Sequence, residues 1–506
     1  MLHKTKKQQK FISQQYRRSV ERALNVKFSF VCPSPTPRAK GTVEAPWPPL
    51  GVLYCAGMLK NDGVEVSVLD QAAKRASSEQ VLNWVKREDP DILGFSVLIT
   101  SYREALNLAR QAKETNPDLL TVFGNYHATF NAERILKKDR FVDVIVRGEA
   151  EQAVLGLADC VNKKRGLEEI AGLTFRNKNH IVSTPDAPLM NNIEALPIPD
   201  RDLTGAEYAS EIFGIKVATR RFTSIISSRG CPFRCSFCGC RKFARGVWRP
   251  RSVENIMEEL LLLYSKGYRQ FLFVDDNFTL NLRRVQRLCR EINKEKLDIE
   301  WFCDSRVDNC QYEVFRDMVK AGCRLLYFGV ESANQRILNY FNKGITPDQT
   351  RKAVAYARKA GIDVIVGSFI VGAPDETKKE IETTLRFAYE LDIDVPQLNV
   401  LSAFPGTDSW NDLVAKGFIN EEEHWEQGVY ASQVSPDAVP LEEIQKMIYE
   451  YLRAFYLRPK KLLDEILKTS RSRYRLSALL SNSIRAGEIL ETVRRKTNLE
   501  PITVDS

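Results

Sequence analysis

Residues 228–238 read Ser228-Arg229-Gly230-Cys231-Pro232-Phe233-Arg234-Cys235-Ser236-Phe237-Cys238, and they follow an apolar segment at 222–227 that is typical of a β-strand. The three cysteines have the spacing C-x3-C-x2-C. Thiolates are the soft ligands that iron–sulfur clusters require, and three of them leave the fourth iron of a [4Fe–4S] cluster open to an external chelating ligand. We therefore predict that Cys231, Cys235 and Cys238 bind such a cluster.

A structural zinc loop over 231–240 is the alternative interpretation of this motif. Zinc in a structural site normally takes four protein ligands, and Cys240 is a candidate for the fourth. No second pair of Cys or His residues lies near in the sequence. The pattern therefore favours the iron–sulfur cluster.

The region from 222 to 435 repeats a strand–helix unit six times. Strands that alternate with helices form a parallel sheet, so six units predict a partial (βα)6 barrel rather than a closed eightfold one. Catalytic groups in such barrels gather at the carboxyl ends of the strands. The predicted strands are Phe222–Ser227, Gln270–Val274, Ile299–Cys303, Leu325–Val330, Ile362–Ile370 and Gln397–Leu401.

Several polar residues and a glycine stand at or near these strand ends and are candidate cofactor-binding residues. Carboxylates suit an ammonium group, and arginine suits a carboxylate. For each polar residue, an ordinary capping role at the end of a strand is the alternative. The candidates are Asp275, Asp276, Ser305, Arg306, Glu331, Ser332 and Gly367.

Residues 26–160 also alternate strand-like and helix-like segments, which is typical of a doubly wound, Rossmann-like α/β domain. The ligand site of such a domain lies beyond the carboxyl ends of its strands. The predicted strands are Val26–Val31, Val64–Leu69, Asp91–Leu98, Leu119–Phe123 and Val142–Val146, and predicted helices lie between them.

The 506 residues are too many for one ordinary core. We predict a basic N-terminal extension (1–25), the doubly wound domain (26–160), a linker (161–220), the barrel (221–435) and a helical C-terminal region (436–506). The net charge of +9 is concentrated at the two ends of the chain. These basic ends predict either a solvated surface or contact with an acidic partner, a nucleic acid or an anionic lipid surface.

The cysteine loop resembles that of the radical S-adenosylmethionine (SAM) superfamily, in which an aromatic residue precedes the last cysteine. Phe237 occupies that position. The resemblance implies that SAM chelates the open iron through its amino and carboxylate groups and is cleaved to a 5′-deoxyadenosyl radical. It further implies that the carboxylates at 275 and 276 meet the SAM amino group, that Arg306 pairs with its carboxylate, that Glu331 holds the ribose, and that Gly367 lies in the adenine-binding strand.

A doubly wound domain ahead of such a barrel resembles the cobalamin-binding subclass, which includes class B methyltransferases and the anaerobic magnesium-protoporphyrin cyclase. The matching residues include Pro48, Gly51, Gly124, Tyr126, His127 and Glu149. The motif Asp-x-His-x-x-Gly, through which some cobalamin domains ligate cobalt, is absent from the sequence. Cobalt is therefore expected to have no histidine below it, and a relic domain that binds no corrin is the alternative.

The leading function is a cobalamin-dependent radical SAM methyltransferase that acts on an unactivated carbon through a 5′-deoxyadenosyl radical and methylcobalamin. A cyclase or an enzyme that forms C–C bonds is the alternative within the same class. A tRNA methylthiotransferase is disfavoured. Enzymes of that kind carry an N-terminal cysteine triad and a small C-terminal RNA-binding barrel, whereas the cysteines within 26–160 have no recognisable ligand spacing and the C-terminus is expected to be helical. A non-enzymatic protein that binds an iron–sulfur cluster or a corrin is the remaining class.

The expected partners are a small-molecule, lipid or peptide substrate and an electron donor such as flavodoxin or ferredoxin. No stable nucleic-acid partner is expected. The eleven cysteines are an odd number and no export signal accompanies them, so a cytoplasmic location is expected. The longest apolar stretches are short and carry charge, so no membrane span is expected.

Overall fold

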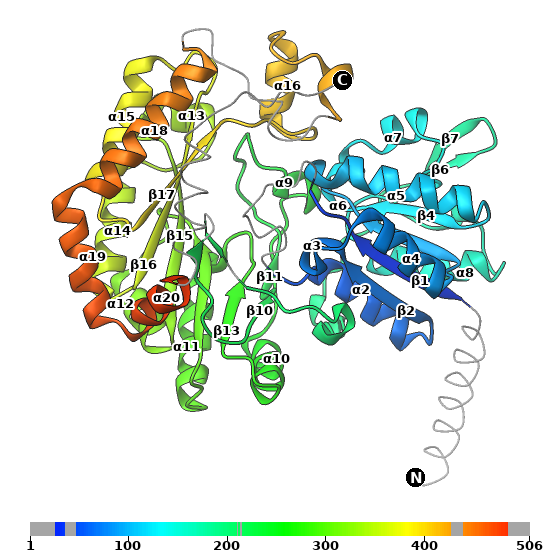
Figure 1. Ribbon diagram of the computed structural model, residues 1–506, viewed down its shortest axis with the longest axis horizontal. Coiled ribbons are helices and arrows are strands. Elements are labelled where there is room, and N and C mark those ends of the chain that lie inside the picture. The colour runs from blue at the N-terminus through cyan, green and yellow to red at the C-terminus, as the bar shows by residue number, and fades with distance from the viewer. Residues whose placement is uncertain (1–25, 36–46, 210, 213–214, 427–438, 484–506) are drawn as a thin grey trace. The chain divides into compact units, whose positions relative to one another are not determined.

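The computed structural model describes residues 26–35, 47–209, 211–212, 215–426 and 439–483. The chain divides into two compact units, and each is built around its own sheet (Figure 1). Of the described residues, the first unit comprises 26–35 and 48–207, and the second comprises Trp47 and those from 208 onward. The predicted extension at 1–25 and the parts of the predicted C-terminal region at 436–438 and 484–506 lie outside the described residues.

The first unit is the doubly wound α/β domain that the sequence predicts. Its sheet has the order β2-β1-β3-β4-β5-β6-β7, in which β1 to β5 run parallel and β6 and β7 antiparallel. The order 2-1-3-4-5 reverses direction between β1 and β3, which is where doubly wound sheets bind ligands. The strands are β1 (Lys27–Cys32), β2 (Glu65–Asp70), β3 (Ile92–Ser96), β4 (Leu120–Gly124), β5 (Val144–Val146), β6 (Leu173–Asn177) and β7 (His180–Ser183).

The helices of this unit form where apolar residues recur every three or four positions. In α5, residues Tyr102, Ala105, Leu108 and Ala112 are buried, so one face of the helix packs on the sheet. In β1 the four consecutive residues from Phe28 are buried, as expected of a strand covered on both faces. The helices are α2 (Leu50–Asn61), α3 (Gln71–Lys74), α4 (Ser78–Glu88), α5 (Tyr102–Thr115), α6 (Asn125–Phe130), α7 (Ala132–Lys138) and α8 (Glu151–Val161).

The segment at 161–220, which the sequence analysis treats as a linker, is folded into the first unit over most of its length. Strands β6 and β7 extend the sheet, and the proline-containing residues beyond them pack on α2. A Cβ atom at Gly57 would lie only 2.7 Å from Cγ of Pro197, and Lys74 donates a hydrogen bond to the carbonyl of Gly205 at 2.6 Å. The first compact unit therefore extends to Glu207.

The second unit contains a partial barrel of six parallel strands in the order β10-β13-β14-β15-β16-β17, as predicted. Its strands are β10 (Phe222–Ile225), β13 (Gln270–Phe273), β14 (Glu300–Ser305), β15 (Cys323–Glu331), β16 (Val364–Val371) and β17 (Val395–Val400). Two short antiparallel pairs accompany the barrel: β8 (Glu211–Ile212) with β9 (Ile215–Lys216), and β11 (Ser228–Arg229) with β12 (Arg249–Pro250).

Helices cover the outer face of this barrel, and the main core lies between them and the strands, around Trp301, Phe315 and Phe328 (Figure 1). The helices of this unit before the C-terminal region, not all of which belong to that outer layer, are α9 (Cys240–Phe243), α10 (Val253–Ser265), α11 (Leu282–Lys294), α12 (Tyr312–Lys320), α13 (Gln335–Tyr340), α14 (Pro347–Ala360), α15 (Lys378–Glu390), α16 (Asp408–Ala415) and α17 (Glu421–His424). A smaller cluster around Phe222, Phe302 and Val366 lies on the other side of the sheet.

The described part of the C-terminal region is helical, as predicted. It consists of α18 (Leu441–Leu457), α19 (Pro459–Arg471) and α20 (Arg473–Ser483). Tyr474 of α20 belongs to the small cluster with Phe302, and its hydroxyl donates to the carbonyl of Val217 at 3.0 Å. Among the helices of the described ranges, none has both the length and the apolar character that crossing a bilayer demands.

Candidate active site

The cysteine loop begins directly after β11 and is held by two other parts of the second unit. Gly230 has a φ of +84°, and a Cβ atom there would collide with the carbonyl oxygen of Val247, so the start of the loop requires glycine. The N–H of Ser236 donates to the carbonyl of Phe341 at 2.9 Å, and its own carbonyl accepts from the N–H of Ser409 at 2.9 Å. The loop is therefore positioned by backbone contacts to residues at the ends of α13 and α16.

The three predicted ligands are free, half-buried thiols on this loop. Burial raises the pKa of Cys231 to about 11 and also raises that of Cys235, while a hydrogen bond with Cys240 lowers the pKa of Cys238 to about 7. No three His, Cys, Asp or Glu side chains of the described residues converge around one ion. A three-cysteine cluster site does not require such a point, because each thiolate binds a different iron. The donor set therefore fits a [4Fe–4S] cluster.

Arg306 lies against the cysteine loop. Its guanidinium Nη1 is 3.8 Å from Sγ of Cys235, and its Cζ is 3.6 Å from the centre of the Phe233 ring. The same side chain makes a two-point ion pair with Asp308, at 3.0 and 2.8 Å, and donates to the carbonyl of Lys343 at 2.6 Å. Arg306 therefore positions the loop and places positive charge beside the sulfur of Cys235, a predicted ligand, while its hydrogen-bond donors are largely used within the protein.

Glu331 forms a buried ion pair that the sequence analysis does not anticipate. Lys343 donates to Oε1 of Glu331 at 2.6 Å, and both side chains are buried. The ammonium group lies 5.8 Å from the centre of the Phe237 ring, and its charge favours the thiolate forms of Cys235 and Cys238. Lys343 lies in a turn between α13 and α14, twelve residues after the end of β15 in the sequence, and for this reason the strand-end pattern does not single it out.

The two carboxylates after β13 have different surroundings. Asp275 is buried and accepts three hydrogen bonds from the chain that leads into the cysteine loop: from the N–H and hydroxyl of Ser227, at 2.7 and 2.6 Å, and from the hydroxyl of Ser228 at 2.5 Å. Asp276 is exposed, and its charge acts on Cys231, Cys238 and Cys240. Asp275 therefore supports the loop, and Asp276 is the carboxylate that is open to a ligand.

The remaining strand-end candidates are buried polar or packing residues. Ser305 bonds to the hydroxyl of Thr279 at 2.7 Å, and Ser332 bonds to the hydroxyl of Thr384 at 3.0 Å. Gly367 is buried in β16, where a Cβ atom would lie 3.0 Å from the Phe369 ring. Phe237 packs edge-on against Phe341 with ring centres 5.3 Å apart. Serines 305 and 332 thus fasten neighbouring elements together.

A carboxylate inside the barrel escaped the sequence analysis. Asp304 in β14 lies on the same face as Phe302, because Trp301 and Cys303 between them pack in the helix-covered core. Its side chain is exposed to solvent within the barrel, and the loss of hydration among the surrounding protein groups, together with the charges of Asp275 and Asp276, raises the pKa of its carboxyl to about 7. An acid directly after the apolar run from 301 to 303, on the same strand face as Phe302, is the pattern that could have revealed it.

In the first unit, three glycines follow strands at their carboxyl ends. Gly51 stands in α2 after β1, Gly124 ends β4, and Gly148 follows β5. A Cβ atom would meet nothing within 4 Å at Gly51 and Gly148, and only the carbonyl of Val146 at 3.9 Å at Gly124. Backbone that is not screened by side chains allows a flat ligand to approach closely. This edge therefore fits a corrin held by shape and backbone contacts.

The other candidates of the first unit differ in exposure. His127 is buried, with its ring centre 4.7 Å from that of Tyr102, and this burial lowers its pKa to about 3. Pro48 is buried ahead of α2, Tyr126 is half-buried beside Phe130, and Glu149 accepts a hydrogen bond from the N–H of Met190 at 3.4 Å. His127 therefore stabilises the packing of α6 as a neutral imidazole.

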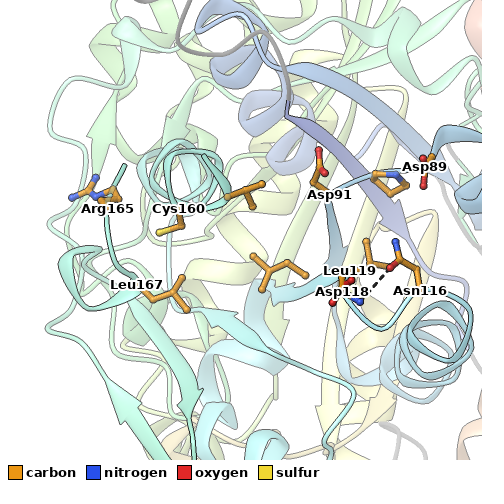
Figure 2. Close-up of a pocket in the computed structure, with 11 residues that line it drawn as sticks. Asp89, Asp91, Asn116, Asp118, Leu119, Cys160, Arg165 and Leu167 are labelled. Atoms are coloured by element: carbon orange, nitrogen blue, oxygen red, sulfur yellow. Dashed lines mark hydrogen bonds between the residues drawn. The ribbon is translucent and has the colours of Figure 1, made fainter. Parts of the chain in front are cut away.

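A pocket of about 500 Å³ lies at the opposite edge of the same sheet (Figure 2). Asp91 and Leu119, which line it, precede β3 and β4, and Cys160 lies at the end of α8. Asp91 accepts a hydrogen bond from the N–H of Lys27 at 2.8 Å, and Asn116 accepts one from the N–H of Asp118 at 3.2 Å. The amino edge of a doubly wound sheet is not its ligand edge, so this pocket is outside the candidate site.

Two family models match the chain, one in each unit. The radical SAM superfamily matches residues 225–388, and the B12 binding domain matches residues 39–158. An uncharacterized methyltransferase of Pyrococcus horikoshii is 35% identical over 446 residues, which cover 88% of this chain and 95% of that protein. The chain belongs to the radical SAM superfamily. As a member that also carries a B12 binding domain, this radical SAM enzyme has a [4Fe–4S] cluster, SAM and cobalamin as its cofactors.

Further similarities agree with this assignment. The anaerobic magnesium-protoporphyrin IX monomethyl ester cyclase of Rubrivivax gelatinosus is 28% identical over 453 residues, which cover 87% of this chain and 79% of the cyclase. The structure of the radical SAM methyltransferase TsrM from Kitasatospora setae, with cobalamin and a [4Fe–4S] cluster bound, has a TM-score of 0.64 at 18% identity, and the match covers 77% of this chain and 78% of TsrM. The present chain therefore shares the fold of TsrM.

Proposed function

We propose that this radical SAM enzyme is a cobalamin-dependent C-methyltransferase that acts on an unactivated carbon. The observation that carries the proposal is that one chain combines the three-thiol loop of the second unit with the open glycine backbone at the carboxyl edge of the first. The similarity to a protein named as a methyltransferase, over 95% of that protein's length, supports the same reaction.

The roles that we propose follow from what each side chain already contacts. Cys231, Cys235 and Cys238 hold the cluster, and Asp276, whose carboxylate is exposed, meets the amino group of SAM. Arg306 and the Glu331–Lys343 pair position the loop and offset the negative charge of the thiolates. When bound, the cluster and SAM supply a 5′-deoxyadenosyl radical, and the corrin supplies the methyl group.

The substrate is proposed to reach the inner face of the barrel near Asp304. Tyr327 lies next to Asp304 in the register of β14 and β15, and its hydroxyl donates to Oε1 of Gln397 at 2.7 Å. Hydrogen-bonding groups at this position suit a small molecule, lipid or peptide that carries a hydroxyl or amino group near the reacting carbon. Asp304→Asn is expected to weaken apparent substrate binding about tenfold, which steady-state kinetics would test.

A cyclase that transfers no methyl group is the second candidate, and the 28% identity to the magnesium-protoporphyrin cyclase favours it.

The electron donor is proposed to be a small one-electron carrier such as flavodoxin or ferredoxin. Such a carrier and a cluster of this kind suit the reducing cytoplasm that the cysteine usage of the sequence predicts.

The two candidates differ in the products that they make from SAM. A methyltransferase forms S-adenosylhomocysteine and 5′-deoxyadenosine in about equal amounts when it is coupled to substrate, whereas a cyclase forms 5′-deoxyadenosine and almost no S-adenosylhomocysteine. The test is mass spectrometry of the products after turnover with methyl-deuterated SAM. A substrate-derived product without a deuterated methyl group, beside abundant 5′-deoxyadenosine, would overturn the methyltransferase in favour of the cyclase.

A further inference from the structure

Helix α19 packs with its charged face toward the barrel and its apolar face toward solvent. Lys461 is buried and donates to the carbonyl of Ile393 at 2.8 Å, and Lys468 reaches Asp392 at 2.9 Å. On the other side of the helix, Leu463 is 58% exposed and Ile466 is 66% exposed. Amphipathic helices of globular proteins normally bury the apolar face, so this arrangement leaves the most hydrophobic part of α19 uncovered.

The neighbouring helices extend the same apolar exposure. α18 and α20 both contact α19, and Leu457 of α18 and Leu479 of α20 are 62% and 58% exposed. α20 is held from within: Arg475 pairs with Asp394 at 2.7 Å and with Glu465 at 2.6 Å. We call Leu457, Leu462, Leu463, Ile466, Leu476 and Leu479 the C-terminal apolar surface. Its helices are thus fixed by charges on their inner sides, while aliphatic side chains point outward.

The chain around this surface is strongly basic. Residues 453–483 contain eight Lys or Arg and two Asp or Glu, a net charge of +6 in a chain whose total is +9. Both acidic residues, Asp464 and Glu465, lie in α19, and Glu465 is already paired with Lys461 and Arg475. Arg453, Arg471 and Arg473 are exposed. Lys461, Lys468 and Arg475 are paired inward with Asp392, Asp394 or Glu465, so the positive charge that faces solvent at this surface is that of the exposed arginines.

We propose that the C-terminal apolar surface docks the enzyme onto a bilayer that contains anionic phospholipids. Exposed aliphatic side chains enter the boundary between headgroups and acyl chains, and the surrounding Lys and Arg contact the phosphates. A second copy of the chain would bring the same exposed arginines against these, which disfavours self-association. A single-stranded nucleic acid would be bound through cations and stacking aromatic rings, whereas the exposed large hydrophobic side chains of α19 are all leucine or isoleucine. The proposal does not depend on which reaction the barrel catalyses.

The test is co-sedimentation of the full-length, anaerobically purified chain with vesicles. Vesicles of phosphatidylcholine with phosphatidylglycerol are expected to bind the protein, and vesicles of phosphatidylcholine alone to bind it at least about tenfold more weakly, because they lack the electrostatic attraction. Raising the salt to about 0.5 M should weaken the first interaction without abolishing it, since salt screens charges but not apolar burial.

Two double variants separate the apolar contribution from general surface effects. Leu463→Gln with Ile466→Gln is expected to weaken binding to anionic vesicles by about tenfold or more. The matched control is Leu261→Gln with Leu262→Gln in α10, where the leucines are 41% and 42% exposed on a helix with three Glu and no Lys or Arg. The control should bind as the unmodified chain does. Melting temperatures of both variants equal to that of the unmodified chain would show that neither substitution destabilises the fold.

A third variant and a measurement of mass complete the test. Arg471→Gln with Arg473→Gln should weaken binding to anionic vesicles several-fold and leave binding to phosphatidylcholine unchanged. The proposal is overturned if the unmodified chain does not sediment with anionic vesicles at low salt, or if the α10 control loses as much binding as the α19 variant. It is also overturned if light scattering shows a dimer that only the α19 variant dissociates, since the surface would then join two copies.

Discussion

The two units carry their candidate cofactor sites at the same kind of place, the carboxyl edge of a parallel sheet, but they build them from different material. In the barrel, the cysteine loop is held by charged side chains that have partners, such as Asp275, Arg306 and the Glu331–Lys343 pair. In the first unit, the edge is bare backbone at Gly51 and Gly148. A site built from side chains depends on residue chemistry, whereas a site built from backbone depends on the absence of side-chain volume.

The largest effect that this comparison predicts comes from the cysteine loop. Replacing Cys231, Cys235 or Cys238 with Ala should abolish the bound cluster and the formation of 5′-deoxyadenosine, because each thiolate holds a separate iron. Iron content after anaerobic reconstitution and product analysis by liquid chromatography would measure both. Cys240→Ala is the matched control within the same loop and should retain about four irons. Loss of iron in that variant would show that Cys240 is a ligand.

The second prediction concerns the ion pair beside the loop. Lys343→Met leaves the buried carboxylate of Glu331 without its cation and should lower the free energy of unfolding by about 3–5 kcal/mol. Adding Glu331→Gln to this variant should restore part of the loss, since the unpaired charge is then removed. Urea unfolding of the single and double variants measures the difference. A loss below about 1 kcal/mol in Lys343→Met would mean that water solvates the carboxylate.

The same contrast explains what the sequence could predict. The six barrel strands, the five parallel strands of the first unit and the helical C-terminus follow from local hydrophobic periodicity, and the structure confirms them. The roles of Asp275 and Arg306 do not follow, because a strand-end residue can face a ligand or its own chain, and only the tertiary contacts distinguish the two. Lys343 lies in a turn far along the chain from the cysteines, so no local pattern connects it to them. The folding of 161–207 onto the first unit likewise depends on tertiary contacts, such as that of Pro197 with Gly57.

The third prediction tests the interior of the first unit through pH. Burial lowers the pKa of His127 from 6.5 to about 3, so the folded chain keeps this imidazole neutral while the unfolded chain protonates it below pH 6.5. Its contribution to stability is therefore present above pH 6.5 and decreases as the pH falls, by about 1.4 kcal/mol per unit or about 2 kcal/mol between pH 6.5 and 5. His127→Gln, which does not titrate, should lack this dependence. Parallel stability curves for the variant and the unmodified chain, from urea unfolding at several pH values, would contradict the neutral buried imidazole.

The prediction with the smallest expected change in stability concerns the exposed backbone of the first unit. It uses a substitution whose effect on stability and whose effect on ligand binding have opposite signs. Gly51 is an exposed helical residue with no atom within 4 Å of a Cβ position, so Gly51→Leu should raise the free energy of unfolding by about 0.5 kcal/mol, because leucine favours the helix more than glycine does. If a corrin lies against this backbone, the same substitution should reduce the hydroxocobalamin retained after desalting several-fold, because the new side chain occupies the space of the ligand. Gly57→Ala in the same helix is the control: its Cβ atom would lie 2.7 Å from Pro197, so it should lower stability without contacting the ligand edge. Retention that stays unchanged in a stabilised Gly51→Leu variant would place the corrin away from α2 and leave Gly124 and Gly148 as the backbone it approaches.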